Sequence, residues 1–547
     1  MKYLHFFETD SAFKTARTSS YTEPWVSLTN ENDDVNYNKI PLRPLTFKIL
    51  SDGNIGWKIG SGSTARTIQY SKNGGGWTDI TSTSEGATIS VVTGDVLRFK
   101  GDTWPGSNYN NYSKFTSTCR FAAFGNPGSL KYGEVTYGEE SLELWCYYGL
   151  FDGCTFLNSA PELPATTLAN SCYFHMFCDC TSLTKAPKLP ATTLDGQCYR
   201  EMFYGCTGLT TAPTLPATTL KDSCYGSMFK GCTSLTTAPK LPATKLTSAC
   251  YQHMFYGCTS LTTAPALPAT TLADNCYNYM FKNCTSLTTA PELPATRMVT
   301  YCYYHMFDGC TSLTSAPALP ATTLANYCYD NMFSSTSLTT APALPATTLT
   351  TYCYNGMFSY CTNLTSAPAL PATTLAQGCY QDMFRNCTNL TSAQTLPATT
   401  LKSDCYREMF MNCTSLTTAP ALPATTLARN CYYWMFDGCT NLTTAPALPA
   451  TTLADSCYDG MFTNCSKLTT APDLPATTLI SNCYREMFYG CKKLNYIKCL
   501  ATNISASYAL YNWLKSASST GTFYKKAGVT YPSDTSGIPT GWTVVEV

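Results

Sequence analysis

The sequence predicts an α/β solenoid of 26-residue repeats, preceded by a small β-sandwich. The first observation is the unit CYQHMFYGCTSLTTAPALPATTLADN at Cys250–Asn275, which recurs from Cys146 to Cys483 with fourteen starts. The second is an apolar pattern typical of one helix face in each unit, and the third is a threonine run that ends at a proline. Because one such unit cannot bury its own apolar face, we expect successive units to stack on one another.

A helix is expected in the first part of each unit. Leu272 is followed at spacings of four, five, eight and nine residues by Cys276, Tyr277, Met280 and Phe281. This spacing predicts an amphipathic helix over about Leu272–Lys282, with Thr271 as its N-cap. Asn283, at a position that is usually Gly or Asn, supplies the left-handed conformation that closes a helix.

A very short strand is expected in the second part of each unit. The threonines after Leu287 favour a strand, and Pro291 cannot donate to a ladder. Strands stack about 4.8 Å apart, whereas helices pack about 8–10 Å apart. The prediction is therefore a curved stack, with a parallel sheet of short strands on the concave side and helices on the convex side.

The units, written CYxxMFxGCTSLTTAPALPATTLA, resemble BspA-type leucine-rich repeats, a family found on microbial surfaces and in phages of gut bacteria. The resemblance covers Cys146 to about Cys499, and the family's AF-x-x-C element corresponds to MF-x-x-C. The units are longer than the usual repeat and place Pro and Ala where the family has a strand Ile. The resemblance implies a leucine-rich-like solenoid and a surface role, but no particular chemistry.

Composition bounds the expected partners and location. The chain of 547 residues has 35 basic and 35 acidic residues and is rich in hydroxyl groups. A formal net charge of zero argues against nucleic acid or an anionic membrane as the main partner. The start, MKYLHFFETDSAFK, lacks the apolar core of a secretory signal, and no run of eighteen apolar residues occurs. We therefore expect no membrane insertion.

Thirty cysteines raise the question of a disulfide scaffold. Twenty-seven lie in the repeat pairs, such as Cys250 and Cys258, where the predicted helix would hold the two thiols about two turns apart. The favoured interpretation is a ladder of buried, reduced thiols. Disulfides between neighbouring repeats remain an alternative, and zinc is disfavoured because histidine is scarce and no paired CxxC motifs occur.

The chain divides into five predicted regions. In residues 1–44, the stretches EPWVS and VNYNK resemble the N-termini of proteins from gut Bacteroidales phages, and this resemblance implies an N-terminal docking segment. The alternative is an extra strand on the next domain. Residues 45–125 form the β-sandwich, with Trp57 and Trp77 expected in its core. Residues 126–145 are the N-terminal cap of the solenoid, residues 146–495 the solenoid of about 14 repeats, and residues 496–547 the C-terminal cap.

Two irregular stretches interrupt the repeats. The unit that starts at Cys328 is one residue short and lacks its second cysteine, so we expect a looser turn near Ser334–Thr336. After Cys491 the pattern decays, and the run KKLNYIKCLATNISASYALYNWLKSAS is interpreted as a last strand followed by an amphipathic helix. Terminal repeats of a solenoid must be atypical because they cover the exposed core.

No catalytic, metal or cofactor constellation is evident in the sequence. The histidines lie two or three repeats apart or in the leader, and no phosphate loop, zincin motif or nucleophile elbow occurs. Some positions after each repeat start vary freely between repeats. These positions either drift because they are exposed or carry ligand contacts, and in the second case aromatic residues could stack on sugars. The candidate ligand-binding residues are Tyr304, Tyr433, Trp434 and Tyr489.

These observations favour a non-enzymatic adhesion or receptor-binding protein of a phage particle. In this hypothesis the N-terminal segment docks to virion proteins, and the solenoid presents its repeat surface to a host cell-surface glycan or protein at the virion surface. The alternatives are a bacterial adhesin at the cell surface and a virion decoration protein without a receptor. Homo-oligomerisation remains open, and ice binding is disfavoured because the threonine pairs lie on a curved surface.

Overall fold

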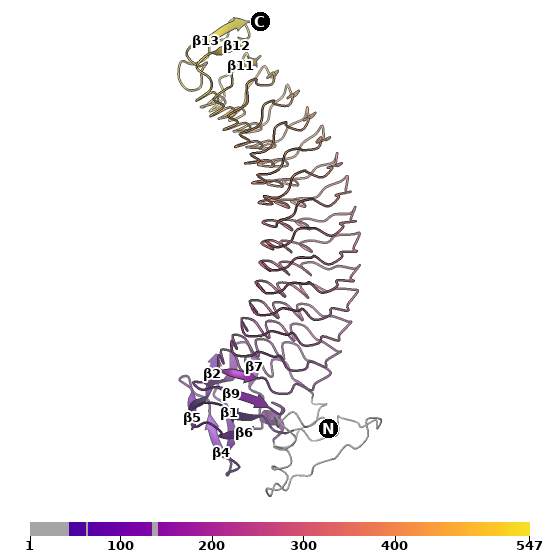
Figure 1. Cartoon of the computed structure of the whole chain (residues 1–547), viewed down its shortest axis with the longest axis vertical. Helices are drawn as coiled ribbons and strands as arrows, with labels where there is room; N and C mark the ends of the chain where they lie inside the picture. The colour runs from indigo at the N-terminus through magenta and orange to yellow at the C-terminus, as the bar shows by residue number, and fades with distance from the viewer. Residues whose placement is uncertain (1–42, 62–63, 134–140) are drawn as a thin grey trace.

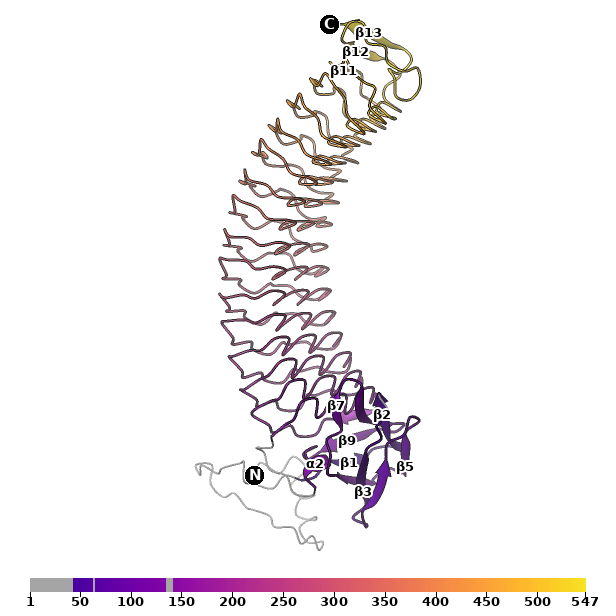
Figure 2. The same cartoon turned by 180° about the vertical axis from the view of Figure 1, so that it is seen from behind.

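The computed structural model describes residues 43–61, 64–133 and 141–547. Figures 1 and 2 show a bowed rod, with a strand-rich domain at one end, a long stack of coils, and a small sheet at the other end. The predicted docking segment 1–44 lies outside the described residues except for its last two positions. The solenoid of stacked repeats is present, but its coils differ from the prediction.

The strand-rich domain consists of two sheets that pack face to face. The order of the six-stranded sheet is β10-β9-β1-β6-β3-β4, and that of the four-stranded sheet is β5-β2-β8-β7. The strands are β1 Thr46–Ile49, β2 Gly53–Ser61, β3 Thr67–Lys72, β4 Thr78–Thr81, β5 Ala87–Val91, β6 Val96–Lys100, β7 Gly106–Asn108, β8 Asn111–Ser117, β9 Phe121–Phe124 and β10 Leu157–Ser159.

Aromatic side chains fill the space between the two sheets. Phe47 and Phe99 of the larger sheet each place their ring centroid 4.9 Å from that of Phe115 in the smaller sheet. Trp57 is 1 % exposed and belongs to this core, as its sequence context predicted. Trp77 does not, because it is only half-buried and its ring lies under the Lys100 ammonium group, 4.3 Å from the ring centroid.

Each repeat forms one coil, and the segment predicted to be a helix is a series of tight turns. In Ala249–Cys258 the amides alternate between two kinds of partner. The amides of His253 and Phe255 donate to carbonyl groups of the next coil, both at 2.9 Å, whereas those of Met254 and Tyr256 donate to the carbonyl three residues earlier. An α-helix would send every amide to the carbonyl four residues earlier. The predicted convex helices are therefore wrong.

The described residues contain one helix, the short α2 at Ser129–Tyr132, which lies outside the repeats. Coil spacing explains why the repeats contain none. The rings of Tyr251 and Tyr277, equivalent residues of adjacent coils, lie 5.9 Å apart, and those of Phe255 and Phe281 lie 5.5 Å apart. Helices need about 8–10 Å between their axes. Turns that hydrogen-bond from coil to coil fit the closer spacing.

The turns place three residues of each coil in the left-handed region of backbone space. In one coil these are Ala249 (φ 52°), His253 (φ 55°) and Gly257 (φ 72°), spaced four residues apart. The left-handed backbone expected at the Gly257 position is thus present, although it closes a turn rather than a helix. This conformation strains residues that have a Cβ by roughly 1–2 kcal/mol each. The hydrogen bonds between coils offset this strain.

The other side of each coil is extended and rich in proline. In Thr262–Thr271 burial alternates, so that Pro265 and Leu267 point inward while Ala266 is exposed. Parallel pairing between coils is reduced to single bridges such as the one between Thr263 and Thr289. The prolines lack the N–H that a ladder requires, which confirms that the paired strand is very short.

Buried side chains continue from coil to coil in columns. Tyrosine rings from Tyr147 to Tyr484 stack with centroids 5.6–6.0 Å apart, and phenylalanine rings form a second column. All thirty cysteines are buried and free, as the favoured interpretation predicted. The Cys258 thiol donates to the Phe229 carbonyl of the preceding coil at 3.1 Å, and most repeats copy this bond. Burial raises the pKa of Cys154 to about 12, so this thiol stays protonated at neutral pH.

The sandwich takes the place of a coil before the first repeat. The amide of Phe115, in β8, donates to the Leu150 carbonyl at 2.8 Å, and the Phe115 ring stacks on Phe151 at 5.6 Å. The Cys154 thiol donates to the Phe115 carbonyl at 3.0 Å, the bond that later repeats make to a preceding coil. Sandwich and solenoid therefore share one continuous core.

The C-terminal end closes the stack in a different way. The predicted amphipathic helix is again a coil of turns, in which the amide of Phe488 donates to the carbonyl of the fully buried Trp513 at 2.9 Å. On the extended side, a parallel sheet with the order β11-β12-β13 continues the column of bridges, because Tyr496 of β11 pairs with Thr470 of the preceding coil. Its strands are β11 Tyr496–Cys499, β12 Gly521–Lys525 and β13 Trp542–Glu546. The domain boundaries proposed from the sequence remain predictions.

The short repeat changes one step of the phenylalanine column. Thr336 stands where other coils have their second cysteine, and its hydroxyl donates to the Phe333 carbonyl of its own coil at 2.8 Å. The bond to the preceding coil is thereby lost. The rings of Phe333 and Phe358 lie 6.0 Å apart, whereas the rings of Phe307 and Phe333 lie 5.6 Å apart. The phenylalanine column is therefore wider at this step, whereas the tyrosine column keeps a spacing of 5.7 Å on both sides of Tyr329.

Candidate functional surface

The side chains that differ most between coils lie on one side of the rod, which we call the turn face. It comprises the turn segment of every coil, equivalent to Ala249–Cys258. Buried pairs such as Cys250 and Tyr251 alternate there with half-buried pairs such as Gln252 and His253. The half-buried positions hold aromatic, charged or amide groups in different coils. Because coils stack in register, variable side chains of neighbouring coils contact one another.

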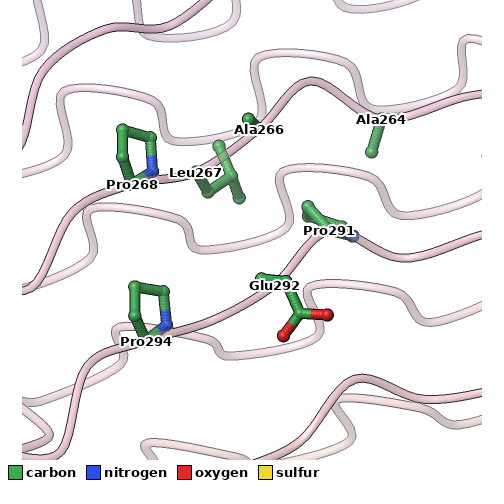
Figure 3. A pocket seen from close by; sticks show the side chains of 7 residues that line it. All are labelled: Ala264, Ala266, Leu267, Pro268, Pro291, Glu292 and Pro294. Carbon is green, nitrogen blue, oxygen red and sulfur yellow. The ribbon is translucent and has the colours of Figure 1, made fainter.

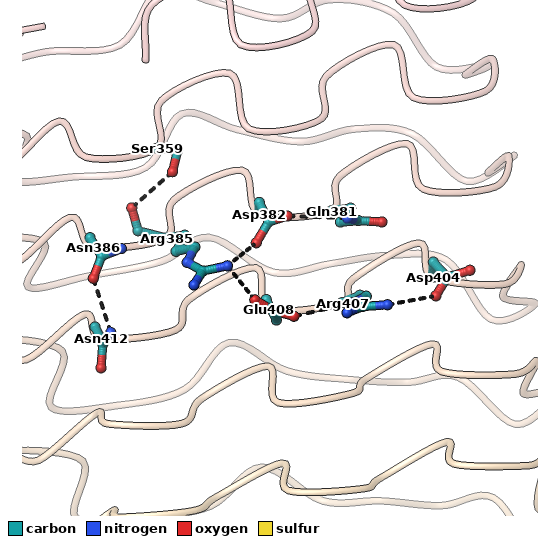
Figure 4. A network of polar contacts seen from close by, with 9 residues as sticks. All are labelled: Ser359, Gln381, Asp382, Arg385, Asn386, Asp404, Arg407, Glu408 and Asn412. Carbon is teal, nitrogen blue, oxygen red and sulfur yellow. Dashed lines mark hydrogen bonds and ion pairs between the residues drawn. The ribbon is translucent and has the colours of Figure 1, made fainter. Parts of the chain in front are cut away.

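An ion network on the turn face links two successive coils, those that start at Cys379 and Cys405 (Figure 4). Glu408 is 8 % exposed and lies between two guanidinium groups: Arg385 Nη1 is 2.5 Å from Glu408 Oε2, and Arg407 Nε is 3.1 Å from Glu408 Oε1. Asp382 accepts from Arg385 at 3.3 Å, and Asp404 lies 3.8 Å from Arg407. Because each arginine contacts two carboxylates, the network holds neighbouring coils together.

Three other carboxyl groups of the turn face are buried, and one of them, Asp459, lies 3.9 Å from Arg485 Nη1. Asp330 is 4 % exposed and accepts from the side-chain amides of Asn331 and Asn355, and burial raises its pKa to about 6. Burial also raises the pKa of Asp437 to about 6 and that of Asp459 to about 7. These carboxyl groups therefore titrate within the physiological range.

Aromatic and imidazole rings form the middle part of the turn face. His253, Tyr279 and His305 occupy the same position in successive coils and stack at 4.8 and 4.9 Å between centroids. Burial lowers the pKa of His253 to about 4, so its imidazole is neutral at pH 7. Tyr301 and Tyr327 stack in the same way at 4.7 Å. Rings stacked along the rod cover one another's faces and present their edges to solvent.

Two predicted ligand-binding residues, Tyr433 and Trp434, lie side by side on the turn face. Both are half-buried, and their rings are parallel with centroids 5.6 Å apart. The Arg407 guanidinium lies 4.9 Å from the Tyr433 ring centroid. The Trp434 indole lies across Gly460 of the next coil, where an added Cβ would come within 2.2 Å of the ring. Neighbouring coils therefore cover part of both rings.

The other two predicted residues lie in different coils. Tyr304 is half-buried and meets Tyr279 and Tyr301 edge to face, with both centroids 5.2 Å away. Tyr489 is half-buried under Lys515, whose ammonium nitrogen lies 5.9 Å from the ring centroid. Tyr304 precedes the coil of Tyr433 by five coils, because its position is filled in turn by Asp330, Asn355, Gln381, Arg407 and Tyr433. The four residues thus do not form one site, and their role in ligand binding remains a prediction.

Sequence reasoning did not single out Arg385 and Glu408, although both occupy freely varying positions. The signal was available, because Arg385 has the same place in its coil as Tyr489, and Glu408 the same place as Trp434. Which variable side chains meet depends on the turn geometry: Arg385 reaches Glu408 of the next coil across a separation of 23 residues.

The extended side of the coils, which we call the proline face, is more uniform. It comprises the segment equivalent to Thr262–Thr271 in each coil. A shallow cavity of about 280 Å³ lies between two adjacent segments there (Figure 3). It is lined by Ala264, Ala266, Leu267, Pro268, Pro291, Glu292 and Pro294. Its volume is below the range of about 300–1,000 Å³ typical of ligand pockets, and Glu292 is its single charged group. This face offers few groups for specific recognition.

One group of metal-ligating side chains occurs within the described parts of the chain. Donor atoms of Asp152, Cys178 and Asp179 lie within 4.8 Å of one another, near the junction with the sandwich. The Lys114 ammonium nitrogen is 2.7 Å from Asp152, so this carboxylate already has a cationic partner. Separately, no helix within the described ranges is long and apolar enough to cross a bilayer.

Comparison with known proteins agrees with this architecture. The family model described as the BspA type leucine-rich repeat region matches residues 149–288, 197–332, 274–417 and 378–516. These overlapping matches extend over more than half of the chain, which therefore belongs to the BspA-type leucine-rich repeat family. Comparisons with curated proteins and with solved structures gave no match.

Proposed function

We propose that this chain is a non-enzymatic adhesion protein that binds a cell-surface glycan or protein through its turn face. The observation that carries the proposal is the unequal variation of the two faces. The proline face repeats nearly the same residues from coil to coil, whereas the turn face changes from stacked rings around Tyr279 to an ion network around Glu408. A surface that serves packing alone has no need for this variety. Membership of the BspA-type family is consistent with a surface role.

In the finer form of the proposal, the protein belongs to a phage particle and the N-terminal segment, residues 1–44, docks to virion proteins. Support comes from the neutral, hydroxyl-rich composition and from the resemblance of the units to a family that occurs on microbial surfaces and in phages of gut bacteria. A bacterial surface adhesin and a virion decoration protein are the competing assignments. Mass spectrometry of purified virions separates them, because absence of the chain from particles would exclude the phage assignment.

The binding proposal is tested by removing coils. Deleting Cys379–Asn430 takes out two whole coils with the ion network, and deleting Cys198–Ala249 takes out two coils of equal length nearer the sandwich. Both variants should fold, because each coil contacts mainly its neighbours. If many weak contacts add along the turn face, each deletion should lower binding to host cells several-fold.

Three outcomes are informative. A gradual loss in both deletions supports a distributed surface. Complete loss in the Cys379–Asn430 deletion alone, with an intact fold, places one discrete site in that stretch. If the full-length chain binds neither cells nor their purified surface glycan, the adhesion proposal is overturned in favour of the decoration protein.

A further inference from the structure

Lysines replace small polar residues at the C-terminal end of the solenoid. The two positions that follow the second cysteine of each coil hold Thr and Ser, Gly or Asn in most coils. In the last two repeats these positions hold Lys467, Lys492 and Lys493 instead, and all three side chains are exposed. The change falls in columns that carry no charge in any earlier repeat.

The register of the coils brings these lysines together. Lys493 is the counterpart of Lys467 in the next coil, since Thr470 and Tyr496 form a parallel bridge three residues further on. The Cys491 thiol donates to the Phe462 carbonyl at 3.0 Å, which fixes the same register on the other side of the lysines. At the spacing of paired strands, about 4.8 Å, the two side chains start from adjacent backbone positions.

A fourth lysine extends the group around the bend of the coil. The Gly490 amide donates to the Lys515 carbonyl at 2.9 Å, so Lys515 lies one coil beyond the turn that leads to Lys492. Its side chain is exposed, and its ammonium group lies over Tyr489, one of the predicted ligand-binding residues. We call Lys467, Lys492, Lys493 and Lys515 the lysine corner.

The lysine corner is uncompensated within the part of the chain that the structure describes. Nearby lysines have partners: Lys498 lies 2.6 Å from Asp473, and Lys525 lies 2.6 Å from Glu546. No ion pair involves the four lysines of the corner among the described residues. Like charges on adjacent coils repel one another wherever they come within a Debye length, which is about 8 Å at physiological salt.

Charged residues often protect an open end of a sheet from aggregation. The lysine corner does not have that position. The coil that contains Lys492, Lys493 and strand β11 is followed by another coil of turns and by strands β12 and β13, so the lysines project from the side of the rod. Local repulsion at a lateral surface is relieved when an anionic partner binds there.

We propose that the lysine corner binds an anionic polysaccharide, in which carboxylate groups recur along a hydroxylated chain. This inference rests on the proposed adhesion function and names the chemistry of the partner at the C-terminal end of the rod, where Lys515 lies on the turn face and the other three lysines directly follow it. Charge complementarity carries it, because a chain with zero net charge concentrates four unpaired ammonium groups in two adjacent coils and the coil that follows. Exposed threonine hydroxyl groups in the coils next to the lysine corner can form hydrogen bonds with the hydroxyl groups of the polysaccharide. Tyr489 lies at its edge.

Binding of the full-length chain to immobilised polygalacturonate, with neutral dextran as the reference surface, tests the proposal. The test variant is K467Q/K492Q/K493Q. The matched control is K188Q/K221Q/K240Q, which removes three exposed lysines from early coils and lowers the net charge equally. We expect the test variant to bind polygalacturonate about tenfold more weakly and the control to bind as the parent chain does, because opposite charges at an exposed surface contribute modestly but additively. The affinity of the parent chain should fall as NaCl is raised.

Equal weakening in the two variants would show general charge attraction and overturn the proposal, as would unchanged binding of the test variant. Tighter binding of the parent chain to duplex DNA than to polygalacturonate would point to nucleic acid instead. Cell binding distinguishes this inference from the proposed function. A test variant that loses polygalacturonate but keeps full cell binding leaves adhesion standing and removes the lysine corner from it.

Discussion

The turn face and the proline face belong to the same coils, yet different interactions hold them. On the turn face the amides of His253 and Phe255 reach the next coil, and side chains such as Arg385 and Glu408 pair across coils. On the proline face fewer backbone bonds join the coils, at isolated bridges such as Thr263–Thr289 and in bonds such as that from the Thr270 amide to the Thr244 carbonyl at 3.2 Å. Most of the specific bonding between coils is therefore on the face where the residues vary most.

This difference shows how a repeat protein can vary without losing its fold. The backbone hydrogen bonds of the turn face do not depend on which side chain stands at the half-buried positions. Ring stacks and ion pairs can therefore replace each other from coil to coil. On the proline face a proline, leucine and alanine pattern does the packing, and few alternatives preserve it.

The largest expected effect is the loss of stability when a buried side chain of either face is shortened to alanine. Phe255→Ala should destabilise the protein locally by about 3–5 kcal/mol, because it removes a fully buried ring that stacks on two neighbours. Leu267→Ala, 3 % exposed on the proline face, should cost about 2 kcal/mol, near the low end for buried leucines, because fewer bonds between coils hold the site rigid. Thermal denaturation and limited proteolysis measure both. Equal losses would remove the energetic distinction between the faces.

A smaller effect is expected from pH, and it should arise on the turn face alone. The pKa of Asp330 is raised by burial from 3.8 to about 6. Its stabilising contribution is thus complete below pH 4 and is lost as the pH rises through 6, because the unfolded chain ionises first. The titratable groups of His305, Asp382 and Tyr304 also face this carboxyl group. The contribution of Asp330 to the pH dependence is therefore measured as the difference between the parent chain and a variant that is neutral at this position.

Asp330→Asn keeps the oxygen that accepts from Asn355 and removes the titration. It should be more stable than the parent chain at pH 8, by up to about 3 kcal/mol, and equal to it at pH 4. Glu292→Gln, an exposed carboxyl group on the proline face, should change nothing. Unfolding of the three proteins by urea at the two pH values tests this. A pH profile that Asp330→Asn leaves unaltered would contradict the assignment.

The smallest effect concerns backbone strain. Gly257→Val should cost about 1 kcal/mol or more, because a β-branched residue is strained at φ 72°. The nearest atom to an added Cβ is the Gly231 Cα at 4.0 Å, so crowding contributes little. Ala266→Val, exposed on the extended proline face, should leave the melting temperature unchanged. The difference between the two melting temperatures is the measurement, and its absence would mean that the turn tolerates the strain.

The stacking of the repeats, the buried thiols and the left-handed Gly257 position were predictable from the sequence. The helix was not the right element, and the reason lies in the period. Buried residues fall at Cys250, Tyr251, Met254, Phe255 and Cys258, which is a strict repeat of four. A helix would rotate such a stripe by about 40° every four residues. Within one short unit, a period of four residues and the helical period of 3.6 residues predict nearly the same buried positions. The strand pattern next to this segment also favoured a helix, because a strand followed by a helix is a common repeat unit.

The candidate surface was only partly predictable for a related reason. Comparing repeats identified which positions vary, and Tyr433, Trp434, Tyr304 and Tyr489 all lie at half-buried positions on the turn face. Their partners depend on the structure of the turns. Arg407 contacts the Tyr433 ring, and the Trp434 indole packs over Gly460. Both contacts depend on the offset between neighbouring coils, which the sequence pattern alone does not define.

The pairing of asparagine with glycine in adjacent coils has a consequence for which residues the column accepts. An added Cβ at Gly309 would lie 2.2 Å from the Asn283 side chain, and one at Gly438 would lie 2.2 Å from that of Asn412. Asn412 itself follows Asn386 rather than a glycine, and its side-chain amide donates to the Asn386 amide oxygen at 2.9 Å. The column therefore holds either an amide that lies over a glycine or two amides that hydrogen-bond to each other. Replacing Gly309 or Gly438 by asparagine thus requires the preceding asparagine to take the arrangement seen between Asn386 and Asn412.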